Sequence, residues 1–208
     1  TIKDEIVMKG QSNNFSLGFV NYPMYQAADI TCVGANLVPV GKDQLAHIEQ
    51  THEIVDKFNG LYGDTLVRPE ALVGKIGKLV GTDGNPKMGK SLGNTIMLSA
   101  TTEQVKQAVM GMYTDPDRIH ATDPGRVEGN PIFIYHDIFN SNVSEVADLK
   151  ERYGKGKVGD VEVKTKLFTV LEHFLEPIRE RRSFYVNNPK LVKEILAEGT
   201  GVARIETQ

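Results

Sequence analysis

Apolar and polar residues follow two different patterns along this chain. Up to about residue 80, short apolar runs end at glycine or proline, whereas in the second half apolar residues recur every three or four positions. The first pattern is typical of short strands and helices joined as α/β units, and the second is typical of amphipathic helices. The sequence therefore predicts an α/β part followed by a nearly all-helical part.

The first part contains a predicted helix and a predicted strand. We expect the helix to begin at Pro23, because proline suits a first helical position, and to continue through Met24–Ile30. The apolar run Leu37–Val40 is predicted to be a strand that ends at Gly41.

A second helix is predicted after this strand. Apolar residues from Asp43 onward fall on one helical face, and Gly60 is expected to stop the helix. A strand that leads through glycine into a helix is an α/β unit, and such units place their site at the carboxyl end of the strand. Leu66-Val67 is a further strand-like pair.

The second half predicts a small helical bundle. Thr101 and Gln104 have the spacing of a capping box at the start of one helix. The expected helices are Thr101–Tyr113, Ile132–Phe139, one capped by Ser144, Val163–Glu180 and one opened by Pro189.

Composition narrows the class of protein. Charged residues make up 25% and apolar residues 40% of the 208 residues, which is ordinary for a water-soluble protein with a core. The formal net charge is −3, so an RNA partner would have to be met by local basic patches. No apolar run of about 18 residues is present, so we expect no membrane association.

Cysteine and histidine give no sign of a disulfide or a metal site. Cys32 is the single cysteine, which excludes an internal disulfide framework and suits a reducing compartment, and we expect a cytoplasmic protein in which this side chain is buried. His47 and His52 are five residues apart, which is not a metal-ligand spacing on a helix, and we expect both on the surface.

The richest candidate for chemistry is the stretch Gly84–Asn94, which we call the lysine loop. It holds three glycines, a proline, two lysines three residues apart, and Ser91. Glycine lets backbone N–H groups approach a phosphate, and the lysines bring mobile positive charge to the same place. The loop is therefore interpreted as closing over a polyphosphate; the alternative is a solvated lysine-rich turn.

A second candidate lies on the first helix. Tyr22, Gln26 and Asp29 are four and three residues apart and so share one helix face. That face offers an aromatic wall, an amide and a carboxylate to one small ligand; the alternative is that Asp29 is an ordinary surface acid. Val38 and Val40 alternate along the strand and point to the same side.

Several motifs together resemble one family of enzymes. Lys87-Met88-Gly89-Lys90-Ser91 is similar to the KMSKS signature loop of class I aminoacyl-tRNA synthetases, with Gly89 where the family usually has serine. The stretches YPxxQAADI and VPVGxDQ, with the later MYTDPDRI and DPGRVEGNPIF, resemble the tryptophanyl-tRNA synthetase family. The match runs over most of the chain, from Thr1 to about Ala203.

The resemblance implies a role for each matching position. Asp29 would accept the indole N–H of L-tryptophan, in a pocket completed by Tyr22, Gln26, Ile30, Val38, Val40 and Gln44. The nucleotide would be held by Gly41, Lys42, Asp43, Leu79, Met88 and Gly89, with Asp43 and Gly41 at the ribose and Leu79 and Met88 at adenine. The pyrophosphate leaving group would be stabilised by Lys87, Lys90 and Ser91.

The resemblance also implies substrates, partners and a division of the chain. The substrates would be L-tryptophan, ATP with its Mg²⁺, and tRNA(Trp), and the protein would be a homodimer. The expected fold class is α/β. Residues 1–82 would form a partial Rossmann-like class I synthetase catalytic domain, 83–95 the lysine loop, and 96–208 an all-helical tRNA-recognition domain.

One family signature is missing and two rival interpretations remain open. No His-x-Gly-His pattern occurs, so we expect the first half of the nucleotide-binding fold to precede Thr1 and the 208 residues alone to be inactive. One rival is a tyrosyl-tRNA synthetase, whose pocket uses a similar residue set. The other is a non-catalytic relative that binds a nucleotide or a partner, for which Gly89 and the missing signature argue.

Overall fold

The computed structural model describes residues 16–207 apart from Lys75, Lys78 and Ala121. The chain divides into two compact units, Thr1–Gly77 with Lys193–Gln208 in one and Lys78–Val192 in the other. The expected helix tail at residues 1–10 lies outside the described residues, as does most of the expected loop at residues 11–16.

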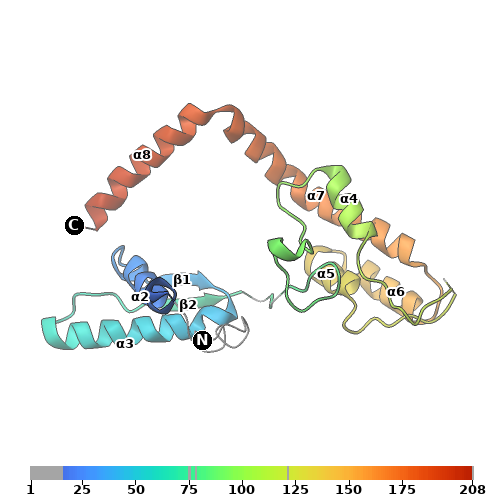
Figure 1. Ribbon diagram of the computed structural model, residues 1–208, viewed down its shortest axis with the longest axis horizontal. Helices are drawn as coiled ribbons and strands as arrows, with labels where there is room; N and C mark the ends of the chain where they lie inside the picture. The colour runs from blue at the N-terminus through green and yellow to red at the C-terminus, as the bar shows by residue number, and fades with distance from the viewer. Residues whose placement is uncertain (1–15, 75, 78, 121, 208) are drawn as a thin grey trace. The chain divides into compact units, whose positions relative to one another are not determined.

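The first described helix, α2, spans Leu17–Thr31 and begins earlier than expected (Figure 1). The Ser16 side chain caps it by accepting a hydrogen bond from the Phe19 N–H at 3.2 Å. Pro23 is therefore inside the helix, and the predicted start was wrong. The helix accepts this proline on a buried stripe that it shares with Ala27 and Ile30, so burial offsets the backbone hydrogen bond that proline cannot make.

Two short parallel strands follow. The strand β1 spans Leu37–Val40 as predicted, and β2 spans Glu70–Val73. They pair in parallel, with Leu37 opposite Glu70 and Val40 opposite Val73. The strand expected at Leu66-Val67 was placed too early, because pairing with β1 begins only after Pro69.

The helix α3 connects the two strands. A 3-10 turn, η1 (Lys42–Gln44), leads from β1 into α3, which spans Leu45–Tyr62. The helix continues past Gly60, contrary to prediction, and ends at Gly63, whose φ of 83° suits glycine and closes the helix. The helix α3 packs against α2 and, by Ile48 and Val55, forms the small core of this unit.

The second unit is helical, as its apolar periodicity predicts. Its helices are α4 (Thr102–Met110), α5 (Pro131–Phe139), α6 (Val143–Gly154) and α7 (Asp160–Asn187), and the chain continues into α8 (Pro189–Glu206). Thr101 caps α4 in a complete capping box, as expected. The cap of α6 is Asn142 and not Ser144, since its side chain accepts from the Glu145 N–H at 3.1 Å.

Helix α7 is the central helix of this unit. It lies along α4 and α5 (Figure 1) and continues past the expected end at Glu180, with Pro177 inside the helix. One face of α7 is buried by Val163, Leu167, Leu171 and Leu175. None of the helices in the described part of the chain is long and apolar enough to cross a membrane.

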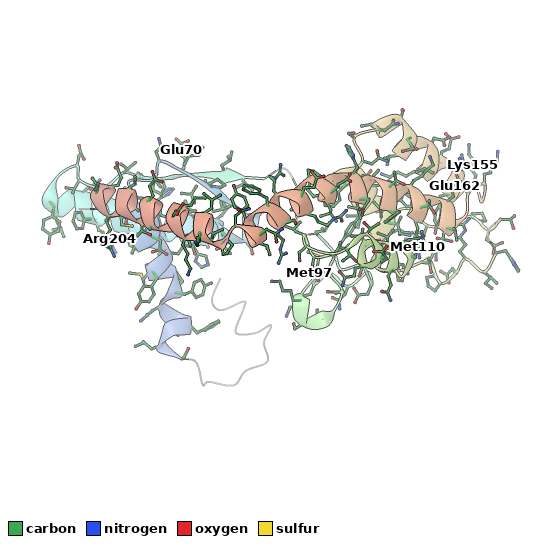
Figure 2. All side chains as sticks on the ribbon, turned by 90° about the horizontal axis from the view of Figure 1, so that it is seen from above. Glu70, Met97, Met110, Lys155, Glu162 and Arg204 are labelled. Atoms are coloured by element: carbon green, nitrogen blue, oxygen red, sulfur yellow. The ribbon has the colours of Figure 1, made fainter. Side chains whose placement is uncertain are left out.

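A buried lysine fastens α4 to α7. The Lys164 ammonium donates to the carbonyl oxygens of Met110 at 2.9 Å and Met112 at 2.8 Å, at the end of α4 that Figure 2 labels by Met110. These carbonyls belong to the last turn of the helix and its exit, where backbone acceptors need partners. Desolvation lowers the pKa of Lys164 from its usual value, while the Asp160 carboxylate opposes that shift.

A buried histidine joins α5 to α7. The His136 Nε2 atom lies 3.1 Å from the Val163 carbonyl oxygen, and its Nδ1 lies 3.3 Å from the Asn140 amide nitrogen. Because the carbonyl only accepts and the amide nitrogen only donates, the ring is neutral with its proton on Nε2. Burial lowers the pKa of His136 below 6.5, although the Val163 carbonyl and then Glu145 and Asp137 act in the opposite direction, and Lys166 lowers it further.

We predict that this histidine makes the fold less stable in mild acid. Since the folded pKa is the lower one, the unfolded chain binds more protons below 6.5, and the free energy of unfolding falls as the pH drops from there towards the folded pKa. Urea denaturation between about pH 7 and pH 5 should show this slope, and His136→Gln should flatten it. The exposed His173 supplies the control, because His173→Gln should keep the slope. Equal slopes in wild type and His136→Gln would contradict the assignment.

Candidate functional site

The predicted residues of α2 meet Gln44 of η1 beside the contact between α2 and α3. The Gln26 amide nitrogen donates to Gln44 Oε1 at 3.3 Å, and the Tyr22 hydroxyl lies 3.0 Å from His47 Nε2. The Tyr22 and His47 rings meet edge to face, with centroids 5.2 Å apart. The structure therefore brings Tyr22, Gln26 and Gln44 together in one polar cluster.

His47 belongs to this cluster, and its expected surface position was wrong. It is only 6% exposed, and its ring packs edge to face against that of Tyr22. His52 is half-buried and also departs from expectation, since its Nε2 lies 2.6 Å from the Pro69 carbonyl oxygen. The signal that sequence reasoning overlooked is that His47 follows Gln44 by three residues, as Gln26 follows Tyr22 by four, so the two pairs can face each other.

Asp29 lies one turn further along α2, at the exposed end of the face that carries Tyr22 and Gln26. Its carboxylate has no hydrogen-bond or ion-pair partner among the described residues, so it is available to a ligand donor. Ile30 is 8% exposed and turned into the core. Cys32, expected to be buried, is exposed at the end of this helix because it falls outside the buried stripe.

The carboxyl end of β1 carries the next group of predicted residues. Val38 and Val40 are half-buried on one side of the strand. Gly41 then opens η1, and the Asp43 carboxylate folds back over it, because a Cβ at this position would lie 2.7 Å from Asp43 Oδ1 and would displace the carboxylate. Lys42 and Asp43 are both exposed at this point. The arrangement presents a carboxylate and a cation beside a bare backbone, which suits a ligand rich in hydroxyl groups.

The lysine loop belongs to the second unit and is held by side-chain amides. Asn94 is 3% exposed, and its Oδ1 accepts from the Gly89 N–H at 2.9 Å. Its Nδ2 donates to the Lys87 carbonyl and to Asp83 Oδ1, each at 3.0 Å. Asn85 Oδ1 accepts from the Lys87 N–H at 2.9 Å. The backbone of the loop is therefore ordered by hydrogen bonds although it contains little regular structure.

The charged side chains of the loop take no part in these hydrogen bonds and are exposed. Lys87, Lys90 and Ser91 are exposed, and Lys90–Leu92 forms the short turn η2 that Gly93 closes with a φ of 67°. Two mobile ammonium groups and a hydroxyl on an ordered backbone suit a polyphosphate. No ion pair engages either lysine among the described residues.

The loop is anchored to the helical core behind it. The Tyr135 hydroxyl on α5 donates to the Val80 carbonyl at 2.9 Å and lies 3.7 Å from the Met88 sulfur. Burial, with a smaller contribution from Asp83, raises the pKa of Tyr135 to about 12, so the phenol keeps its proton and remains a donor. Leu79 and Val80 pack against the core. Sequence reasoning missed Asp83, Asn94 and Tyr135, because each has a backbone partner that no motif specifies.

The first unit contains a parallel strand pair with a crossover helix, and a polar cluster lies near the carboxyl end of β1. The second unit contains the lysine loop and the helices that follow it. This combination is typical of a class I aminoacyl-tRNA synthetase. A family model described as tRNA synthetases class I (W and Y) matches residues 1–176, and the chain belongs to that family. Its fold is accordingly a partial Rossmann-like α/β part with a helical part, as expected.

Curated and solved relatives carry tryptophan in their names. The chain is 51% identical to a tryptophan–tRNA ligase of Chlamydia caviae, over 91% of this chain and 55% of that protein. It is 49% identical to one of Treponema pallidum, over 98% of this chain and 60% of that protein. A crystal structure of tryptophanyl-tRNA synthetase from Campylobacter jejuni with ADP and tryptophan matches 100% of this chain and 63% of its own, at 35% identity and a TM-score of 0.78. The chain thus spans less than two thirds of each of these three proteins.

We predict that Gly89 tolerates the family's usual serine. Its φ of −164° and ψ of 145° are open to any residue, and a Cβ there would meet its nearest neighbours in Leu92 at 3.8 Å, an ordinary contact. Gly89→Ser should raise the free energy of unfolding by about 0.5 kcal/mol, because serine reduces the freedom of the unfolded chain.

Gly93, four residues later, is the matched comparison. Its φ of 67° is unfavourable for any side chain, so Gly93→Ser should destabilise by about 1 kcal/mol. Urea denaturation of both variants and of wild type gives the two changes in the free energy of unfolding. A destabilised Gly89→Ser would mean that the loop needs glycine at this position.

Proposed function

We propose that the protein activates L-tryptophan with ATP and transfers the activated amino acid to tRNA(Trp). In the first step a tryptophan carboxylate oxygen attacks the α-phosphorus of ATP, the bond to the bridging oxygen breaks, and pyrophosphate leaves. A ribose hydroxyl at the tRNA 3′ end then attacks the carbonyl carbon of tryptophanyl-adenylate and releases AMP. The observation that carries the proposal is the lysine loop in a chain about half identical to tryptophan–tRNA ligases.

The amino acid would bind at the polar cluster of α2. Indole has one N–H donor and no acceptor, and the unpartnered Asp29 carboxylate is an acceptor. A site built to receive this N–H penalises an amino acid that lacks it, because its carboxylate would be left unmatched. Tyr22, Gln26, Ile30, Val38, Val40 and Gln44 would complete the pocket, and the Gln26–Gln44 hydrogen bond fixes two of them relative to each other.

The residues that the family resemblance implies for the nucleotide fall into two groups, one at the end of β1 and one around the lysine loop. Asp43, folded over Gly41 beside Lys42, would accept from the ribose hydroxyls. Leu79, Met88 and Gly89 would lie against the adenosine, and Lys87, Lys90 and Ser91 would stabilise the leaving pyrophosphate. No protein nucleophile takes part, so catalysis comes from positioning and electrostatic stabilisation.

Mg²⁺ would reach the site on the phosphates of ATP. The described residues contain no group of three or more His, Cys, Asp or Glu placed to hold a metal ion. The phosphate oxygens would therefore supply most of its ligands, and the ion would neutralise charge that develops on the leaving group.

The remaining partners follow the same family. The acceptor would be tRNA(Trp), recognised through the helical unit; with a net charge of −3, contact would rest on local basic patches. We also propose a homodimer and a cytoplasmic location, and a division into residues 1–82, 83–95 and 96–208.

Amino-acid-dependent exchange of labelled pyrophosphate into ATP tests the activity. The full-length protein should exchange pyrophosphate with tryptophan and not with tyrosine. Lys87→Ala and Lys90→Ala should each lower the rate by about 100-fold, the effect of removing one group that stabilises developing charge. Exchange that depends on tyrosine would favour the tyrosyl-tRNA synthetase interpretation, and no exchange with any amino acid would favour the non-catalytic one.

We further predict that Asp29 selects tryptophan. Asp29→Ala should lower kcat/KM for tryptophan by about 10- to 100-fold, because a hydrogen bond to a charged group contributes about 1.5–3 kcal/mol. Asp64→Ala is the matched control, since Asp64 is an exposed carboxylate in the same unit. If Asp29→Ala retained both activity and selectivity, the pocket would have been placed wrongly.

A further inference from the structure

The side chain of Asn94 is the most constrained polar group in the lysine loop. It is 3% exposed, whereas the residues immediately before it, Ser91, Leu92 and Gly93, are exposed. All of its hydrogen-bonding directions towards the loop are used: Oδ1 accepts from Gly89, and Nδ2 donates to the Lys87 carbonyl and to Asp83. The orientation of the amide is fixed, because the Gly89 N–H can only donate and the Lys87 carbonyl can only accept.

The Asn94 amide packs closely against the backbone of Gly81. A Cβ on Gly81 would lie 2.3 Å from Asn94 Nδ2 and 2.5 Å from Asp83 Oδ1. The Gly81 N–H in turn donates to the Asn85 carbonyl at 2.8 Å, and the Thr82 N–H donates to the Asn94 carbonyl at 3.0 Å. The bare backbone of Gly81 therefore forms one wall of the space that Asn94 fills.

The segment behind Asn94 is attached to the helical core. The Thr82 carbonyl accepts from the Tyr113 N–H at 2.9 Å, just after α4, and the Val80 carbonyl accepts from the Tyr135 hydroxyl on α5. Asp83 accepts from the Asn85 N–H and from Asn94, and these two bonds, in that order, lower the pKa of its carboxyl. An ionised Asp83 is thus a fixed acceptor for the second N–H of the Asn94 amide.

The backbone segment that Asn94 binds carries both Lys87 and Lys90. The Lys87 carbonyl accepts a hydrogen bond from the Asn94 amide, and the Gly89 N–H donates one to it. The Gly89 carbonyl accepts from the Leu92 N–H at 3.0 Å, in the turn that contains Lys90. The two lysine backbones are therefore fixed relative to each other through one side chain.

We propose that Asn94 is a positioning residue, which holds the backbone of the lysine loop so that Lys87 and Lys90 face the same polyphosphate. The proposal rests on the function proposed above for the two lysines. Asn94 does not touch the phosphates itself; it acts through the Lys87 carbonyl and the Gly89 N–H. Losing these bonds would leave both lysines charged and exposed but no longer directed to one place.

The test compares Asn94→Ala with wild type in the full-length protein by three measurements. Calorimetric affinity for inorganic pyrophosphate should fall by about tenfold or more, since several hydrogen bonds that order the loop are lost. In tryptophan-dependent exchange kcat should fall by a similar factor with little change in KM for tryptophan, because the residues proposed for its pocket lie in the other unit. Trypsin should cleave after Lys87 and Lys90 faster than in wild type. Asn187→Ala, at an exposed asparagine on α7, is the matched control.

A charge exchange separates positioning from general damage to the fold. Asn94→Asp would place two carboxylates together and should lower pyrophosphate affinity further. Asp83→Asn keeps the acceptor oxygen and should change little by itself. The double variant Asp83→Asn with Asn94→Asp removes one of the two carboxylates, so it should recover the additional loss caused by their repulsion but not the loss caused by the missing donor to the Lys87 carbonyl. A thermal midpoint recorded for each variant shows whether the helical core remains folded.

The results that would overturn the proposal are distinct from those that would overturn the proposed function. Unchanged pyrophosphate affinity in a folded Asn94→Ala variant, or a double variant that binds pyrophosphate as tightly as wild type although it lacks the donor to the Lys87 carbonyl, would refute the positioning role. Absence of exchange in wild type would refute the proposed function, while pyrophosphate affinity and tryptic cleavage would still decide the role of Asn94.

Discussion

Backbone N–H and C=O groups outside helices and sheets need other partners, and this requirement shapes the stretch between β2 and α4. From Gly81 to Asn94 the chain has only one short turn of regular structure, so side-chain amides and a carboxylate supply the missing hydrogen bonds. Tyr113 and Tyr135 connect that network to the helices. The conformation of the candidate phosphate-binding loop therefore depends on its hydrogen bonds to the helical core.

Different residues therefore order the loop backbone and present charge to a ligand. The network beneath the loop uses neutral amides and one ionised carboxylate, while the exposed lysines have no carboxylate partner among the described residues. A lysine held in an internal ion pair would have to break it before meeting a phosphate. The same division occurs at the end of β1, where Gly41 provides bare backbone and Asp43 remains exposed above it.

The sequence predicted those elements whose determinants are local. The strand Leu37–Val40 follows from an apolar run ended by glycine, and the capping box at Thr101 from two residues three apart. Two predictions failed because a distant partner decided the outcome. Pro23 was placed at a helix start because its buried contacts were not visible in the sequence, and His47 was assigned to the surface because Tyr22 lies 25 residues away.

The candidate site divides in the same way. Tyr22, Gln26 and Gln44 were named from motifs, and the structure brings them together. Asn94 is the last residue of the lysine loop, yet nothing in its neighbours indicated burial, because two of its partners are a carbonyl and an N–H group common to every residue. The buried Lys164 has a consequence of another kind. An amine-reactive reagent would modify Lys87 and Lys90 at once but could reach Lys164 only when α4 parts from α7, so the labelling rate at this one lysine would measure how often the helical core opens.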